Sequence, residues 1–260
     1  MIRLVPFLFF LVIATPGLAA SSAWHVTEGG AVRLVTAEAP GNGILRGALE
    51  IRLEPGWKTY WLDPGEWGVP PQVELVGSGA DRPVKIRFPA PRWMEDEFSA
   101  WAGYDRSTLL ALELPGDATL PLAANVFLGI CRSICIPVQA EFTVESRAQS
   151  DPQEAMLLEA AFAGLPGSAD RDFGVTALLP DRDRKRLQAF IALPADADRA
   201  ELFIADQGGW KFGRPAPGTG ATLSVPVIAW PEDISAEELT YTLVSGGRAV
   251  EGAVRLGTQP

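Results

Sequence analysis

The sequence is short of the side chains that bind transition metals. Its 260 residues include two cysteines, one histidine and three methionines. Zinc and copper sites in proteins are built mainly from these side chains. The composition therefore argues against a dedicated metal site, and we expect no metal or other cofactor.

Positive charge is scarce as well. The chain carries 22 lysines and arginines against 32 aspartates and glutamates, which gives a formal net charge of −10 at pH 7. Proteins that bind nucleic acid through its phosphates need a basic surface. Nucleic acid is therefore not among the expected partners.

Long hydrophobic runs are absent beyond the first residues. The opening MIRLVPFLFFLVIATPGLAASSA is typical of a secretory signal, because Arg3 precedes an apolar run at 4–15 and small residues at 17–19 offer a cleavage site. The run is short for a membrane span, although an uncleaved anchor is the alternative. We expect residues 1–23 to be a signal peptide and the mature protein to be exported.

The rest of the chain has the pattern of short strands separated by turn formers, with 26 glycines and 22 prolines. A first series of β-rich runs lies at 30–38, 44–54, 71–77, 108–115, 120–130 and 137–145. A second series lies at 173–180, 186–194, 199–206, 221–230 and around the turn pair Gly246-Gly247. Such spacing is typical of β-sandwiches.

One helix is predicted between the two series, at 150–167. Asp151 can cap it, Pro152 suits its first turn, Glu154 can complete a capping box, and Gly164 can end it. The sequence therefore predicts an all-β protein with two tandem β-sandwich domains joined by a short helix. The expected bounds are 24–149 for the first domain, 150–167 for the helical linker and 168–260 for the smaller second domain.

Both cysteines lie in the stretch GICRSICIP, where three residues separate Cys131 from Cys135. An extended strand would hold them about 13 Å apart, beyond the reach of a disulfide. A helical turn or a tight hairpin brings the Cα atoms to about 6 Å. A disulfide therefore requires the chain to turn back at residues 132–134.

Two roles are open for this pair. A staple across a five-residue loop would restrain the unfolded chain by only about 2 kcal/mol, which a chain with two sizeable cores hardly needs. A short-loop pair in an exported protein is easily opened and closed, and one cysteine can resolve a mixed disulfide formed by the other. The sequence does not decide which cysteine attacks, and we favour Cys131.

The neighbouring sequence favours the redox role. RWMEDEFSAWAGYD at 92–105 combines acidic and aromatic residues, which can shield a reactive dithiol and handle its protons. We expect Tyr104 to contribute to this shielding. The alternative is an acidic surface loop whose aromatic side chains belong to the core. A second aromatic stretch at 54–71 indicates a packed strand and loop rather than a site.

Together these segments resemble the periplasmic N-terminal (alpha) region of the DsbD family of transmembrane thiol-disulfide reductases. GWKTYWLDPGEWGVPP, RFPAPRW and CRSICIP are similar to the branch related to ScsB, and the resemblance covers about residues 30–145 well and the second series more loosely. It implies an immunoglobulin-like first domain. It also implies that Phe98 is a lid over the cysteines, with Asp96 and Glu97 flanking the site in an acidic-aromatic cap loop.

The resemblance implies a function as well. In the family this domain takes electrons from the membrane reductase through a thioredoxin-like domain and reduces exported proteins. No part of the 260-residue sequence resembles the membrane-embedded cysteine domain or the thioredoxin-like domain, which supply the electrons in the family. We therefore expect a separate thioredoxin-like or membrane-embedded thiol reductase as the donor, and periplasmic client proteins with disulfides as acceptors. No dissociable cofactor is needed, because the dithiol itself carries two electrons.

The sequence thus predicts a periplasmic thiol-disulfide relay, a component of a protein-disulfide reductase that works through Cys131 and Cys135. Two alternatives stay open. The tandem sandwiches could form a non-catalytic binding or scaffold module with a permanently closed disulfide. A copper-handling role is suggested only by the association of the ScsB-like branch with copper tolerance, and the lack of a His/Met cluster argues against it.

Overall fold

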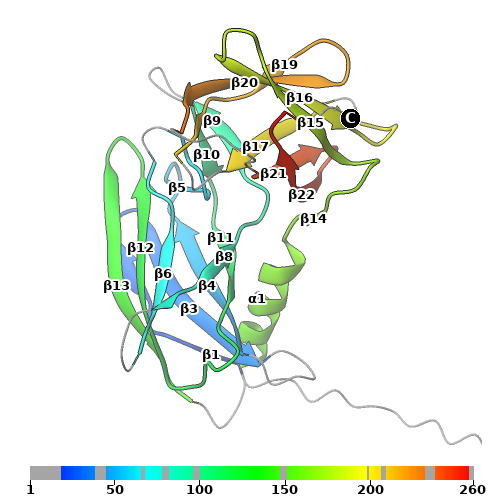
Figure 1. Ribbon diagram of the computed structural model, residues 1–260. Helices are drawn as coiled ribbons and strands as arrows, with labels where there is room; N and C mark the ends of the chain where they lie inside the picture. The colour runs from blue at the N-terminus through cyan, green and yellow to red at the C-terminus, as the bar shows by residue number, and fades with distance from the viewer. Residues whose placement is uncertain are drawn as a thin grey trace, which may run out of the picture.

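The computed structural model describes residues 19–38, 45–65, 68–77, 82–95, 100–146, 151–197, 199–205, 209–231 and 238–257. Within these ranges the chain forms two β-sandwiches and one helix, α1 (Pro152–Ala163), which follows the first sandwich in the chain (Figure 1). The predicted all-β architecture with two tandem sandwiches joined by a short helix is confirmed. No helix in the described part of the chain is long and apolar enough to cross a membrane.

Two sheets enclose the core of the first sandwich, and the cysteines belong to the second of them. The first sheet has the order β1–β3–β4–β11–β8, with β2 beside β3. Its strands are β1 (Ala19–Ser21), β2 (His25–Thr27), β3 (Gly30–Glu38), β4 (Leu45–Leu53), β8 (Lys85–Arg87) and β11 (Thr108–Glu113). The second sheet has the order β7–β6–β12–β5–β10–β9, with β13 beside β12. Its strands are β5 (Lys58–Tyr60), β6 (Gln72–Val76), β7 (Arg82–Pro83), β9 (Arg92–Glu95), β10 (Ala100–Tyr104), β12 (Leu122–Cys131) and β13 (Cys135–Val144).

The second sandwich is smaller and has a core of its own. One sheet joins β14 (Gly167–Ser168), β22 (Arg248–Arg255), β21 (Glu238–Ser245) and β17 (Glu201–Ala205). The other joins β15 (Gly174–Pro180), β16 (Arg186–Ala192), β20 (Thr222–Ala229), β18 (Lys211–Phe212) and β19 (Ala216–Pro217). The predicted hairpin at Gly246-Gly247 is confirmed. Both glycines have positive φ, 58° and 75°, as a two-residue hairpin turn of this kind requires.

Helix α1 begins and ends where the sequence predicts, but it is more than a connector. The side chain of Asp151 caps it by accepting a hydrogen bond from the Gln153 amide at 2.8 Å. Its Leu158 and Ala161 pack onto a floor of small side chains on the outer face of the first sheet. That floor consists of Ala19, Ala37, Ala48 and Ala111. Alanines leave the room that a close-packed helix needs, so the helix forms part of the first sandwich.

A buried polar group fixes the helix to the sheet. Glu154, which we expected in a capping box, is buried and accepts a hydrogen bond from the Ser21 hydroxyl. Arg33 lies 3.6 Å from the same carboxylate and 2.7 Å from Glu50, which is also buried. Paired charges of this kind are stable in a low-dielectric interior only while all partners are present.

The first described strand falls inside the segment that we predicted to be a signal peptide. Residues 1–18 of that segment lie outside the described residues. Residues 19–21 form β1, which pairs with β3 and holds the Ser21 hydroxyl against the helix. The bounds of the leader and of the domains therefore stay predictions.

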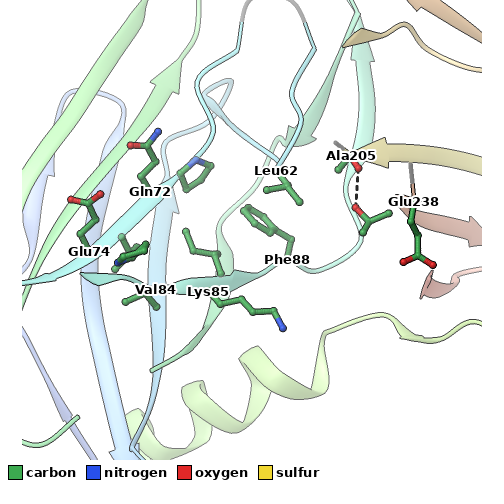
Figure 2. A pocket seen from close by; sticks show the side chains of 13 residues that line it. Leu62, Gln72, Glu74, Val84, Lys85, Phe88, Ala205 and Glu238 are labelled. Carbon is green, nitrogen blue, oxygen red and sulfur yellow. Dashed lines mark hydrogen bonds between the residues drawn. The ribbon is translucent and has the colours of Figure 1, made fainter. Parts of the chain in front are cut away.

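The two sandwiches meet along β17 and β21 on one side and the β6–β8 region on the other. A cavity of about 660 Å³ lies in this junction. Figure 2 shows Leu62 and Phe88 of the first sandwich on one wall, and Ala205 and Glu238 of the second on the other. Next to it the junction is filled, because Phe203 of β17 is fully buried in the core of the first sandwich.

Replacing Glu154 with alanine should lower the free energy of unfolding by about 1–3 kcal/mol, because Ser21 and Arg33 lose a buried acceptor. Urea denaturation followed by circular dichroism measures the change. Glu159→Ala, an exposed position on the same helix, is the matched control and should stay within about 0.5 kcal/mol of the wild type. Equal losses in both variants would contradict the structural role of Glu154.

Candidate functional site

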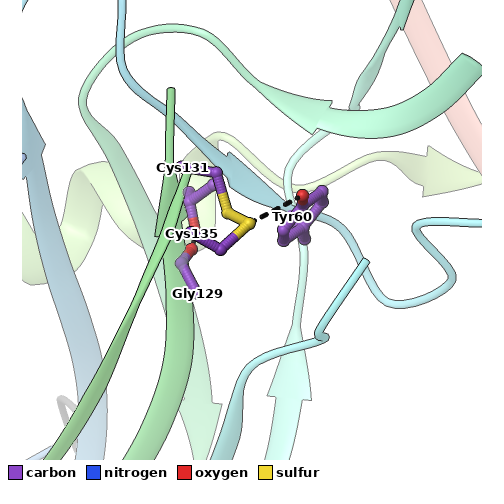
Figure 3. The surroundings of a disulfide bond; sticks show 5 residues. Tyr60, Gly129, Cys131 and Cys135 are labelled. Atoms are coloured by element: carbon purple, nitrogen blue, oxygen red, sulfur yellow. Dashed lines mark hydrogen bonds between the residues drawn. A yellow bond between two sulfur atoms is a disulfide. The ribbon is translucent and has the colours of Figure 1, made fainter. Parts of the chain in front are cut away.

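The two cysteines close a β-hairpin. Strands β12 and β13 are antiparallel, and Cys131 is the direct cross-strand partner of Cys135. The amide of Arg132 donates a hydrogen bond to the carbonyl of Ile134 at 2.9 Å across the turn. The sulfurs form a disulfide, with the Cα atoms 4.0 Å apart (Figure 3). The predicted turn between the cysteines is confirmed, and it is a hairpin turn rather than a helical one.

The two cysteines differ in burial. Cys131 is only 1% exposed, whereas Cys135 and the three turn residues are exposed. The most apolar of these, Ile134, has 67% of its surface open to solvent. Of the two cysteines, Cys135 is therefore the one that a partner protein can reach.

The disulfide lies on the outer face of its sheet. Cys131 is opposite Lys58 on β5. Because side chains two residues apart share a face, Lys58 and Tyr60 both lie on the disulfide side. Tyr60 pairs in turn with Gly103 on β10, which places Trp101 on this side as well. Tyr60 and Trp101 form a buried cluster with Cys131.

Tyr60 is the aromatic side chain in polar contact with the disulfide. Its hydroxyl lies 3.5 Å from the Sγ atom of Cys135 (Figure 3). The ring also lies beside Gly129 of β12, where a Cβ atom would make ordinary van der Waals contacts. A Cβ atom at Gly129 would come within 3.4 Å of the Tyr60 ring and 3.6 Å of the Sγ atom of Cys131.

Lys58 and Met94 complete the surroundings. The Nζ atom of Lys58 lies 3.2 Å from the centroid of the Trp101 ring, a cation–π contact. Met94 on β9 pairs with Trp101 on β10 and packs against the same cluster. The disulfide thus has a phenol, a cation and a large apolar surface beside it.

The predicted cap loop falls on residues that the structure does not describe. Asp96, Glu97 and Phe98 lie outside the described residues. Glu95 and Ala100, on either side, end β9 and begin β10. The described parts of the acidic-aromatic segment are therefore the two strands of a hairpin, whose Trp101 and Met94 already touch the disulfide cluster.

The structure does not bring Tyr104 together with the cysteines, which corrects the prediction that it shields them. Tyr104 pairs with Thr59, one residue from Tyr60, and so points to the opposite face of the sheet. Its hydroxyl donates a hydrogen bond to the Pro89 carbonyl at 2.8 Å. Burial in the core raises the pKa of Tyr104 well above its usual value.

Sequence reasoning missed Lys58, Tyr60 and Trp101. The sequence did hold a signal for the first two. In a strand at GWKTYW, side-chain alternation places Lys58 and Tyr60 on one face and the flanking tryptophans on the other. Those tryptophans, Trp57 and Trp61, do belong to the core. Within the described ranges, no group of three or more His, Cys, Asp or Glu side chains is placed to hold a metal ion.

Tyr60→Phe should slow the reaction of the reduced protein with an aromatic disulfide reagent about tenfold, because the hydroxyl no longer donates to the Cys135 thiolate. Stopped-flow absorbance at neutral pH measures the rate. Tyr104→Phe is the matched control. It removes a phenol from the other face of the sheet, and should cost about 1 kcal/mol of stability while leaving the rate unchanged. If Tyr104→Phe slowed the reaction as much as Tyr60→Phe, the assignment of the two tyrosines would be wrong.

Comparison with known proteins found a family model and a solved structure that are similar to this chain. Residues 32–146, which include both cysteines, match the family model of the N-terminal region of the thiol:disulfide interchange protein DsbD. The crystal structure of the N-terminal periplasmic domain of ScsB from Proteus mirabilis is similar in fold, with a TM-score of 0.76 and 21% sequence identity over 92% of this chain and 99% of that chain. A search of curated proteins gave no match. The predicted resemblance is confirmed: residues 32–146 match the DsbD N-terminal family model, and the fold is similar to that of the ScsB domain.

Proposed function

We propose that this protein is a periplasmic thiol-disulfide relay, which passes two electrons from a thiol reductase to disulfide-bonded client proteins. The observation that carries the proposal is the Cys131–Cys135 disulfide with one buried and one exposed cysteine. The family match supports it, because the matched family is one of thiol:disulfide interchange proteins. The predicted leader at 1–23 and the periplasmic origin of the ScsB domain support the location.

Loading of the relay begins at the exposed cysteine. A thiolate of the reductase attacks the Sγ atom of Cys135, the disulfide breaks, and Cys131 leaves as a thiolate that takes up a proton. The second thiol of the reductase then attacks the mixed disulfide and releases Cys135. The reductase ends as a disulfide, and the relay ends as a dithiol that holds the two electrons.

Unloading is the same chemistry in reverse. The Cys135 thiolate attacks a client disulfide and forms a mixed disulfide with one client sulfur, while the other client sulfur leaves as a thiolate. Cys131 then attacks the Sγ atom of Cys135 and releases the reduced client. Burial suits Cys131 to the resolving role, because it faces its cross-strand partner rather than solvent. We therefore assign the attacking role to Cys135, in place of Cys131, which we favoured from the sequence.

Two neighbours support the thiolate states. The Tyr60 hydroxyl, 3.5 Å from the Sγ atom of Cys135, can donate to the thiolate that forms there. Lys58 is the cross-strand neighbour of Cys131 and carries a positive charge on the same face. A phenol and an ammonium group in these places favour the anionic form of sulfur, which is the reactive form in exchange.

Shielding and docking complete the proposal. Following the resemblance, we assign Phe98 as the lid, with Asp96 and Glu97 flanking the site, between the ends of β9 and β10. A partner that reaches Cys135 also meets Ile134 at the tip of the hairpin, whose exposed side chain offers apolar surface for contact. Thioredoxin-like reductases and unfolded or disulfide-bonded clients are the partners that this arrangement fits.

Two single-cysteine variants test the proposal. Cys131→Ser leaves the exposed Cys135, and Cys135→Ser leaves the buried Cys131. Each is mixed with a single-cysteine thioredoxin activated by an aromatic disulfide, and the released aromatic thiol is followed by absorbance. We expect Cys131→Ser to form the mixed disulfide at least about tenfold faster, because only its thiol is open to a protein. The double serine variant is the blank.

The alternatives give different results. If neither variant forms a mixed disulfide while both stay folded, the pair is a closed structural bond, and the binding or scaffold module takes the place of the relay. If Cys135→Ser reacts faster, the assignment of the attacking cysteine is wrong although the relay stands. Retention of Cu(I) by the reduced wild-type protein after desalting would favour the copper-handling role.

A further inference from the structure

The hairpin β9–β10 has one face toward the disulfide and the other toward the second sandwich. Met94 and Trp101 lie on the disulfide side and join the cluster with Cys131. Trp93, next to Met94 along β9, points to the opposite side. Strand β9 ends its sheet in the described part of the chain. What holds this edge of the hairpin must therefore come from outside the sheet.

A phenylalanine of the second sandwich holds it. The ring of Phe203 stacks on Trp93, with centroids 5.3 Å apart and an interplanar angle of 12°. The same ring meets Trp61 edge to face at 5.8 Å. Phe203 is 0% exposed and belongs to the core of the first sandwich, although it comes from a strand of the second. It therefore fixes Trp93 against the body of the first sandwich.

Two polar contacts reinforce the same edge. The indole Nε1 of Trp93 donates a hydrogen bond to the Leu202 carbonyl at 3.1 Å. Arg214 of the second sandwich forms an ion pair with Glu95, the last residue of β9, at 2.8 Å. Both contacts join β9 to the second sandwich, one at its middle and one at the end nearest residues 96–99.

Strand β17 is suited to this support because it is anchored in both cores. Its Leu202 and Ile204 pack into the core of the second sandwich, while Phe203 and Ala205 pack into that of the first. Alternation along the strand sends successive side chains in opposite directions. A movement of Phe203 would disturb both cores, so the contact with Trp93 is held rigidly.

We propose that the second sandwich supports the hairpin β9–β10, the shielding hairpin, in its place beside the disulfide. Phe203 is the positioning residue, because its contact with Trp93 controls how readily the disulfide reacts with thiols. This inference rests on the proposed relay. When Phe203 holds Trp93, the hairpin keeps Trp101 and Met94 over the buried cysteine. When that contact is lost, the hairpin opens more often, and water and small thiols reach the buried sulfur of Cys131, which leaves as the thiolate when the exposed Cys135 is attacked.

The test compares disulfide reduction in the full mature chain. Phe203→Ala should speed reduction by dithiothreitol on the order of tenfold, the factor by which the open population rises when its free energy falls by about 1.4 kcal/mol. Reoxidation should speed up by the same factor. The reduction potential should stay unchanged, because a gate alters both rates and not the equilibrium. Phe203→Leu, which keeps most of the apolar contact, should stay near the wild-type rate.

Phe212→Ala is the matched control. Phe212 is buried in the core of the second sandwich, where it stacks on Trp210 at 5.4 Å, so it tests general weakening of that sandwich. We expect the Phe212→Ala rate to stay near that of the wild type. Should Phe203→Ala not yield folded protein, Trp93→Phe removes the hydrogen bond to Leu202 while keeping an aromatic ring, and should show a smaller acceleration.

The outcomes distinguish a failure of the proposed relay from a failure of the positioning role of Phe203. A wild-type disulfide that dithiothreitol cannot reduce in the folded protein overturns the relay, and this inference with it. A reducible wild-type disulfide whose rate is the same in the Phe203→Ala and Trp93→Phe variants overturns only the positioning role. Equal acceleration by Phe203→Ala and Phe212→Ala would mean that general loosening, and not the contact with Trp93, sets the rate.

Discussion

The alternation of side chains along the sheet that carries the cysteines decides which groups meet the disulfide. Neighbouring residues of a strand point to opposite faces, so Tyr60 lies against Cys135 while Thr59 points into the sandwich. The same rule sends Trp101 to the disulfide and Tyr104 to the core. A shift of one residue in any of these strands would exchange the two sets. The disulfide thus has its polar and aromatic neighbours because the pairing of β5, β10 and β12 is fixed by a well-packed core on the other face.

The same alternation joins the second sandwich to the hairpin β9–β10. Strand β17 gives two side chains to each core, and the ring of Phe203 stacks on the tryptophan that backs the shielding hairpin. A second contact between the sandwiches is made by Arg87, which forms ion pairs with Glu113 of its own sheet and with Glu251 of the second sandwich. The helix between the sandwiches packs on the first sheet rather than spanning a gap. The second sandwich therefore contacts the hairpin whose Met94 and Trp101 pack beside the disulfide.

Much of this arrangement follows from the sequence, and the rest has identifiable physical reasons. The long alternating strands, the capped helix, the Gly246-Gly247 turn and the reversal between the cysteines are local signals, and the structure has them all. Strands β9 and β10 were missed, since they are short and lie in a segment dense in acidic residues. Tyr104 was assigned to the site because it is near in sequence, whereas contact depends on the register between strands. The position of Phe203 could not be predicted, because no local sequence pattern shows which of the two cores a buried side chain enters.

The measurement that tests the central claim most directly is the reduction potential of the Cys131–Cys135 pair. The purified mature protein is equilibrated in graded thiol buffers, and its free thiols are alkylated and counted by mass spectrometry. A potential above about −300 mV, with Cys135 alkylated before Cys131, is the result that a working relay predicts. A much lower potential, with thiols that stay unreactive in the folded protein, would contradict the relay and leave a structural disulfide in a binding module.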